Sequence, residues 1–404
     1  MARWEPQPPD HSCYPRGFRT AGITCGIKQS GRPDLALIVS DTLCHGAALY
    51  TQNRIAAAPV IVSRRHGYKG VRAIVAASGN ANACTGKRGE RDALTMCEAT
   101  ARAVGAARHE VLVCSTGIIG VPFPIEKVES GIPQAVETLT PTGWESAADA
   151  ICTTDAFPKM AGCHWSVGGD DVRLIGIAKG AGMIQPNLAT MLAFLATDAN
   201  VEAPLLHSVL RAAVRDTFHS ISVDGDTSTN DTLILLANGQ AENSVITPET
   251  DEAVRLEAAV RQVCGELARM MVRDGEGATK LVTLEVSGAR SDDEARQAAR
   301  AVANSVLVKM AFLGSDPNWG RIAAALGSAG VAIRPEALSI GFEGIRVLDQ
   351  GNPATADQAQ LAALLKKPEF TLEIDLGTGE SGHATFWTCD ISEDYVQFNA
   401  RYTT

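Results

Sequence analysis

Hydrophobic and polar positions alternate along short stretches of this chain. Residues 282–287 alternate strictly between apolar and polar types, and so do residues 372–376. Such alternation predicts half-buried strands. Continuous apolar runs at Leu35–Val39, Ala73–Ala77 and Val111–Cys114 predict further strands, because Gly, Ser and Asn residues punctuate this part of the chain.

A helical period is clearest between Leu256 and Met270, where apolar residues recur every three or four positions. The stretch Ala295–Phe312 also predicts one helix, because Ser291 and the acidic residues after it form a typical helix start. Helix and strand patterns are mixed in both halves of the chain. The sequence therefore predicts packed α/β or α+β layers.

Composition and charge narrow the functional classes. The 404 residues include 45% hydrophobic and 20% charged residues, an ordinary globular balance. The net charge of −10 argues against nucleic acid or an anionic membrane as the main partner. Met1–Lys28 has no signal-peptide apolar stretch, and no uncharged run reaches the roughly 20 residues of a membrane helix. We expect a cytoplasmic protein.

Metal and cofactor motifs are incomplete in this sequence. The ten cysteines include no Cys-x-x-Cys pair, and the eight histidines show no metal-ligand spacing. Gly86-Lys87 lacks the rest of a phosphate loop, and Gly180-x-Gly182 lacks the third glycine of a dinucleotide motif. The polar cluster Asp224–Asp231 does not fit a calcium loop and predicts a turn whose side chains bond its own backbone. We therefore predict no metal and no cofactor.

The segment Lys179–Leu192 carries the most informative chemistry. As an apolar stretch broken by Gly, Pro and Asn, it predicts no more than a strand, a turn and a strand. It also has the parts of a self-cleaving junction: small Ala189 before Thr190, and Pro186-Asn187 to set a strained turn. Cleavage would free an α-amine on Thr190, and its pKa near 8 lets it act as base for the Thr190 hydroxyl.

Residues 179–199 closely resemble the self-processing junction of the ornithine acetyltransferase family, whose members are also called glutamate N-acetyltransferases. Further blocks are similar to the family in the same order. They lie at 17–22, 78–86, 115–120, 153–159, 224–231, 274–280, 316–321 and 399–404. The resemblance thus runs collinearly from about residue 17 to the last residue.

The resemblance implies a layered α/β fold similar to that of N-terminal nucleophile hydrolases. It implies a precursor that cuts itself between Ala189 and Thr190. The products would be an N-terminal chain, 1–189, and a C-terminal chain, 190–404, that stay associated. It further implies an α2β2 assembly of two such pairs.

The resemblance also assigns roles to single residues. Thr190 would be the nucleophile, and Thr116 and Gly117 would donate hydrogen bonds to the oxyanion. The family's substrate-binding positions correspond here to Thr153, Lys179, Thr190, Glu276, Asn399 and Thr404. Lys179 suits a carboxylate, and Glu276 suits a protonated amine.

The implied reaction belongs to arginine biosynthesis and has two halves. Thr190 takes the acetyl group from N-acetylornithine and releases ornithine; glutamate then attacks the acetyl-enzyme and leaves as N-acetylglutamate. This predicts ping-pong kinetics without a metal. Some relatives also accept acetyl-CoA, and no residue here decides whether this chain does.

Three residues depart from the family's pattern: Ser315, Gln397 and Gln185. Gln397 is two positions from Asn399, a substrate-binding position. The resemblance therefore implies the reaction class more firmly than it implies the acetyl donor and the acetyl acceptor. Two other functions remain as alternatives: an N-terminal nucleophile aminopeptidase or amidase, and an amino-acid-binding relative that never processes.

Overall fold

A long, bent strand, β2 (Leu35–Tyr50), organises the first of two sheets in the computed structural model, which describes residues 6–67, 69–185 and 191–401. Its first part pairs with β1 and β3, and its last six residues pair with β9. The strand order in this sheet is β4-β3-β2-β9-β7-β6-β5, with β1 paired to β2. The other strands are β1 (Phe18–Ile23), β3 (Lys69–Asn80), β4 (Val111–Ile118), β5 (Lys159–Val167), β6 (Asp170–Lys179), β7 (Leu192–Thr197) and β9 (Thr232–Ala237).

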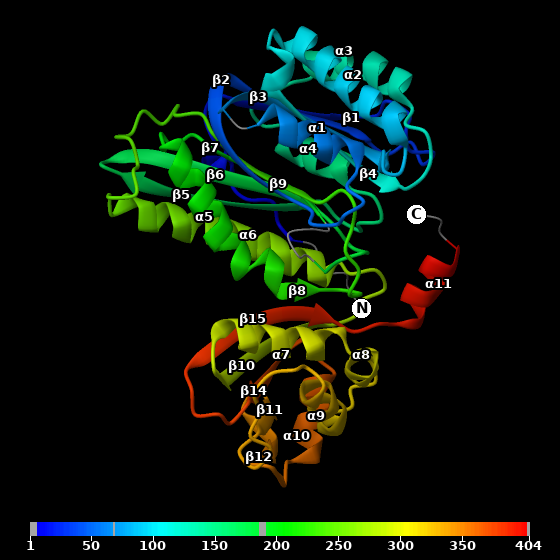
Figure 1. The fold of residues 1–404 in the computed structure, drawn as a ribbon, viewed down its shortest axis with the longest axis vertical. Coiled ribbons are helices and arrows are strands. Elements are labelled where there is room, and N and C mark those ends of the chain that lie inside the picture. Colours follow the sequence, from blue (N-terminus) through cyan, green and yellow to red (C-terminus); the bar gives the residue numbers. More distant parts are fainter. Residues whose placement is uncertain (1–5, 68, 186–190, 402–404) are drawn as a thin grey trace.

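Helices pack on this sheet and make the upper lobe in Figure 1. They are α1 (Ala58–His66), α2 (Gly86–Val104), α3 (Ile125–Glu137), α4 (Trp144–Ile151), α5 (Ala203–Arg215) and α6 (Glu252–Arg273). Successive residues of β2 point to opposite faces, as in any strand. Ile38 therefore joins the hydrophobic cluster that contains Trp144 of α4, whereas Leu37 joins the cluster formed with α2 and α3. Further along β2, Leu49 packs into the cluster formed with α5 and α6.

The second sheet forms the lower lobe in Figure 1, with strand order β13-β12-β11-β14-β10-β15-β8. Its strands are β8 (Ile221–Ser222), β10 (Leu281–Ala289), β11 (Ser339–Phe342), β12 (Ile345–Asp349), β13 (Asn352–Pro353), β14 (Glu369–Asp375) and β15 (Gly382–Cys389). Four helices pack with it: α7 (Asp292–Asn304), α8 (Val306–Leu313), α9 (Trp319–Gly327) and α10 (Gln358–Leu365). Sheets and helices in layers confirm the predicted α/β fold class.

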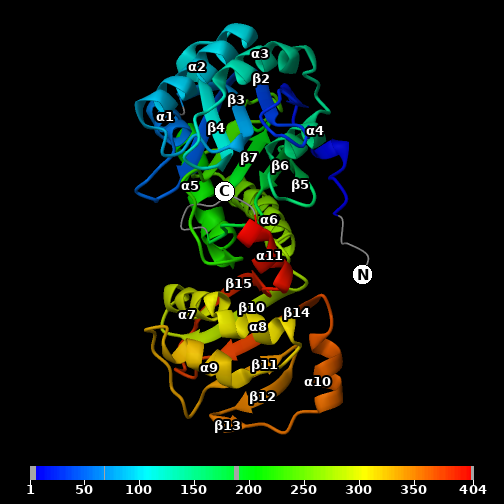
Figure 2. The same ribbon diagram turned by 90° about the vertical axis from the view of Figure 1, so that its right-hand side faces the viewer.

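The last helix, α11 (Glu393–Arg401), leaves the lower lobe after β15 and reaches toward the upper lobe (Figures 1 and 2). Three short 3₁₀ turns complete the elements: His11–Cys13, Arg108–Glu110 and Phe218–Ser220. In the part of the chain that is described, no helix is long and apolar enough to cross a membrane.

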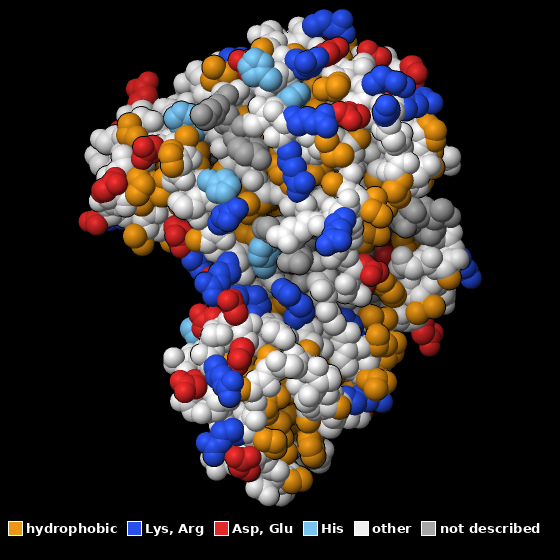
Figure 3. All heavy atoms as spheres, in the orientation of Figure 1, with side chains coloured by type: hydrophobic (Ala, Val, Ile, Leu, Met, Phe, Trp, Pro, Cys, Tyr) orange, Lys and Arg blue, Asp and Glu red, His pale blue; other side chains and the backbone are white. Residues whose placement is uncertain are grey.

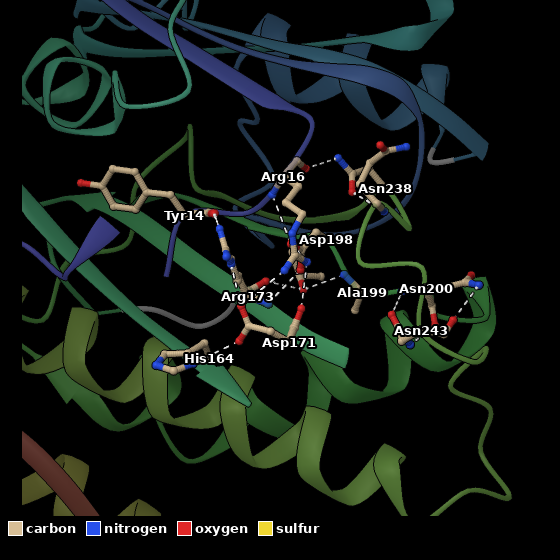
Figure 4. A network of polar contacts seen from close by, with 12 residues as sticks. Tyr14, Arg16, His164, Asp171, Arg173, Asp198, Ala199, Asn200, Asn238 and Asn243 are labelled. Atoms are coloured by element: carbon tan, nitrogen blue, oxygen red, sulfur yellow. Dashed lines mark hydrogen bonds and ion pairs between the residues drawn. The ribbon is translucent and has the colours of Figure 1, made fainter. Parts of the chain in front are cut away.

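The N-terminal arm is tied to the first sheet by a buried carboxylate (Figure 4). Asp198, directly after β7, accepts hydrogen bonds from the backbone N–H of Arg16 (3.2 Å) and from its Nη1 (3.0 Å). Its other oxygen accepts the backbone N–H of Arg173 at 2.8 Å. Burial nevertheless raises the pKa of Asp198, so Arg16 only partly offsets the cost of placing this charge inside.

One helix prediction is wrong and the other predicted elements are confirmed. The stretch Ala295–Phe312 is two helices, α7 and α8, because Ser305 has an extended backbone (φ −69°, ψ 108°). The Ser305 side chain then accepts the N–H of Val308 and starts α8. The predicted strands fall within β2, β3, β4, β10 and β14, although Leu376 lies one residue past β14, and the repeat from Leu256 lies in α6.

Candidate functional site

A cavity of about 210 Å³ lies where the ends of β4 and β6 approach the loop after α6 and helix α11. It brings together all the predicted site residues within the described chain: Thr116, Gly117, Thr153, Lys179, Glu276 and Asn399. The predicted nucleophile Thr190, the cleavage partner Ala189 and the pocket residue Thr404 lie outside the described residues. Met191, the next described residue after Thr190, also lines the cavity.

The last residues of β4 depend on a glycine. β3 and β4 are parallel, and their register places Gly79 opposite Gly117. Gly117 has φ +130°, and a Cβ there would lie 2.3 Å from the carbonyl carbon of Gly79. No other residue type fits this approach, so the end of β4 that presents Thr116 and Gly117 to the cavity requires glycine.

Lys179 ends β6 and points along the cavity wall toward two threonines. Its Nζ donates to Thr116 Oγ1 at 3.0 Å and lies 3.4 Å from Thr153 Oγ1. Both partners are neutral hydroxyls, and only 9% of Lys179 is exposed. An ammonium held this way is suited to bind the carboxylate of a small ligand.

Glu276 supplies the opposite charge, and Asn399 is bonded to it. Asn399 Nδ2 donates to Glu276 Oε2 at 2.9 Å, and so joins α11 to the loop after α6. The Glu276 backbone N–H donates to the carbonyl of Ala181 at 2.9 Å. A Cβ on Gly182 would lie about 2.5 Å from the Glu276 carboxylate, so glycine leaves room for this carboxylate.

Three charged residues next to the cavity were missed by sequence reasoning. Lys159 Nζ donates to Asp155 Oδ1 at 2.6 Å and to Asp274 Oδ2 at 2.7 Å, and the three side chains are at most 5% exposed. Burial alone would raise the pKa of Asp155, but Lys159 and Lys179 outweigh it and hold that pKa below its usual range. The signal was present, because all three residues lie inside blocks that resemble the family.

Asp224 is a further acid on the cavity wall, where the sequence predicted only a turn. Its carboxylate accepts the backbone N–H groups of Met183 (2.6 Å), Ile184 (2.9 Å) and Asp226 (3.1 Å). Burial raises the pKa of Asp224 despite these bonds. The bond to Asp226 also confirms that side chains in the 224–231 cluster bond their own backbone in a turn.

Among the described residues, we searched the surroundings of this cavity for metal-binding groups and reactive thiols. No group of three His, Cys, Asp or Glu side chains able to hold a metal occurs among the described residues. Cys114 lies just before the Thr116 loop, but it is fully buried, and burial raises its pKa. A thiol in that state is a poor nucleophile.

The cavity therefore has a positive side at Lys179, a negative side at Glu276, and a glycine turn beside Thr116. A site of this kind suits a small ligand that carries both charges, as an amino acid does. Fold and site define a layered α/β protein with an amino-acid-sized polar pocket.

Comparison with known proteins identifies the family to which the chain belongs. The model of the ArgJ family matches residues 19–404. The arginine biosynthesis bifunctional protein ArgJ of Geobacter sulfurreducens is 48% identical over 391 residues, covering 96% of this chain and 99% of the relative. The mitochondrial ArgJ of Schizosaccharomyces pombe is 44% identical, covering 96% of this chain and 92% of the relative. The chain belongs to the ArgJ family.

A solved structure is similar to part of the chain. The crystal structure of argJ from Bacillus halodurans has a TM-score of 0.50 and 40% sequence identity. The match covers 98% of that chain but only 52% of this one.

Proposed function

We propose that this chain is an acyltransferase of arginine biosynthesis that moves an acetyl group from N-acetylornithine to glutamate. The observation that carries the proposal is the pocket with Lys179 on one side and Glu276 on the other. Lys179 binds the substrate carboxylate, and Glu276 with Asn399 binds the side-chain amine of N-acetylornithine. Membership of a family whose relatives are named for arginine biosynthesis supports the same reaction.

The transfer proceeds through an ester on Thr190. The Thr190 hydroxyl attacks the acetyl carbonyl while its own α-amine accepts the proton. Backbone groups of Thr116 and Gly117 stabilise the oxyanion, and the C–N bond breaks as the proton passes to the departing ornithine amine. The glutamate amine then attacks the ester, which forms N-acetylglutamate and returns the proton to Thr190 Oγ. Thr404 completes the pocket in this proposal.

Processing between Ala189 and Thr190 creates the nucleophile. The Bacillus halodurans chain supports this step, because about half of our chain accounts for nearly all of that one. The Geobacter sulfurreducens relative, in contrast, is matched over almost its full length by 96% of our chain. A full-length precursor that yields two shorter chains, 1–189 and 190–404, explains both observations.

The first test is the mass of the purified protein under denaturing conditions, beside the variant Thr190→Ala. We expect two fragments that meet between Ala189 and Thr190, and one uncut chain for the variant. The processed protein should then transfer acetyl from N-acetylornithine to glutamate with parallel lines in double-reciprocal plots. An uncut wild-type chain would contradict the proposed nucleophile; acetate release at an unchanged rate without glutamate would indicate a hydrolase instead.

We also propose that the processed protein assembles as α2β2 and is located in the cytoplasm. The exposed apolar residues Val306 and Leu307 on α8, and Val396 and Phe398 on α11, support association of two processed pairs into α2β2. Figure 3 shows acidic and basic side chains interspersed on one face of the molecule. All ten cysteines are described and are free thiols, which suits a reducing compartment such as the cytoplasm. Sedimentation analysis of the processed protein tests the assembly.

A further inference from the structure

The buried residues Asp155, Lys159 and Asp274, here called the ion triad, lie where three segments of the pocket meet. Lys159 begins β5, Asp155 lies in the loop before it, and Asp274 directly follows α6, which packs against β5 (Figure 1). Lys159 is fully buried and bonded to both carboxylates. Two acids and one ammonium leave an excess negative charge, and Lys179 attracts Asp155 across the same region.

Hydrogen bonds extend from the triad to the backbone of the pocket. Asp155 Oδ2 accepts the N–H of Thr153 at 2.9 Å, and its Oδ1 accepts the N–H of Gly180 at 2.6 Å. These are a substrate-pocket residue and the residue after Lys179. Asp274 Oδ2 accepts the N–H of Ala156 at 2.9 Å, so both acids of the triad bond to the backbone of the Thr153 loop.

Asp274 also lies two residues before Glu276. The Glu276 N–H bonds to Ala181 in the Lys179 loop, so the loops at 153–156, 179–182 and 274–276 form one connected unit. We propose that the ion triad is the positioning element of the substrate pocket, and that it sets the distance between the carboxylate-binding and the amine-binding sides. The inference rests on the proposed function.

If the chain is cut as proposed, the ion triad also joins the two resulting chains. Asp155 and Lys159 lie in the N-terminal chain and Asp274 lies in the C-terminal chain. No peptide bond then links Lys179 to the loop of Glu276, so the two sides of the pocket depend on noncovalent contacts. A buried ammonium between carboxylates from both chains is a directional contact, since removing one partner leaves an uncompensated charge inside.

The test compares two acetyl donors on Lys159→Met. N-acetylornithine needs both sides of the pocket, whereas p-nitrophenyl acetate carries the acetyl group without the charged ends. We expect kcat/KM for N-acetylornithine to fall about 100-fold, mostly through KM, while p-nitrophenyl acetate changes less than about threefold. The control Lys309→Met removes another fully buried lysine, bonded to Thr388 and the Cys389 carbonyl, and should lower both rates equally or neither.

Hydrogen–deuterium exchange tests the triad without relying on the donor. Peptides covering 153–156 and 179–182 should exchange faster in Lys159→Met than in wild type, and should not in Lys309→Met. Wild-type protein that reacts only with p-nitrophenyl acetate would contradict the proposed donor, and the exchange result would still decide the triad. If Lys159→Met fails to fold, Asp274→Asn, which keeps an acceptor oxygen, replaces it. Unchanged exchange in these loops, or an equal loss with both donors, would overturn the proposal.

Discussion

At the residue scale, two glycines shape the pocket by lacking a side chain. Gly117 lets the end of β4 approach the end of β3, and Gly182 leaves space for the Glu276 carboxylate. Gly117 is required by its backbone conformation, because its φ is +130°. Gly182 is required only because a side chain there would collide with the Glu276 carboxylate. Their substitutions should therefore fail in different ways.

Gly182→Ala should weaken substrate binding and leave folding nearly unchanged. The added methyl group forces Glu276 to move, because their separation would be only about 2.5 Å. We expect KM for N-acetylornithine to rise about tenfold, which corresponds to about 1.4 kcal/mol of binding free energy. Steady-state kinetics measure this, with Gly327→Ala as control, since a Cβ there meets nothing within 4 Å. Equal KM values for both variants would contradict the steric argument.

The sequence identified pocket residues better than the groups that hold them. Thr116, Lys179 and Glu276 were named from motif resemblance, and the structure brings them to one cavity. Lys159 was visible only as part of a motif, because its role arises from the meeting of distant segments. Charge spacing along one chain does not reveal that Lys159 and Asp274, 115 positions apart, share a hydrogen bond.

At the element scale, local patterns predicted strands and helices but not every interruption. The α6 repeat and the alternation in β10 follow directly from burial on one face. The break between α7 and α8 was missed, because only Asn304 and Ser305 interrupt the apolar pattern there. Ser305 is a preferred N-cap type, and in the structure it caps α8.

The start of α7 offers a stability test. Ser291 is the N-cap, as predicted, and its Oγ accepts the N–H of Glu294 at 3.2 Å. Ser291→Ala should lower the free energy of unfolding by about 1 kcal/mol, because this N–H loses its partner. Ser291→Asp keeps an acceptor and serves as the control. Urea denaturation measures both, and an equal loss in the two variants would show that the cap bond is not the cause.

At the scale of the whole molecule, the order of strands was beyond reach of the sequence. β2 pairs with β9, and β9 pairs with β7, so two strands of the C-terminal half lie between β2 and β6 of the N-terminal half. The hydrophobic periodicity of a strand indicates which of its faces is buried, but it does not indicate which strands lie next to it in the sheet. The two lobes also do not coincide with residues 1–189 and 190–404, since β7, β9, α5 and α6 belong to the upper lobe.

His219 links the lobes and should make stability depend on pH. It lies between α5 and β8 and faces Arg296 and Arg300 of α7. Burial, aided by these arginines, lowers the pKa of His219 to about 4. The unfolded chain therefore binds a proton more readily between about pH 6.5 and 4, so stability is lost as the pH falls through this range, by up to about 3 kcal/mol.

His219→Gln should flatten this dependence. Urea unfolding at pH 7 and pH 5 should give a smaller difference for the variant than for wild type. The exposed His109→Gln is the matched control and should behave as wild type. A variant that loses as much stability as wild type at pH 5 would assign the acid sensitivity to other groups.

The place of β9 between β2 and β7 also bears on how the protein is made. While the ribosome is still translating the N-terminal half, residues 46–50 of β2 lack their β9 partner, and β6 lacks β7. The edge of β6 stays open until residues 192–197 emerge and that of β2 until residues 232–237 emerge, and open apolar edges are sites of aggregation. Synthesis of the two halves from separate messages would prolong that exposure, so the proposed cut is best made only after a single reading frame has been translated.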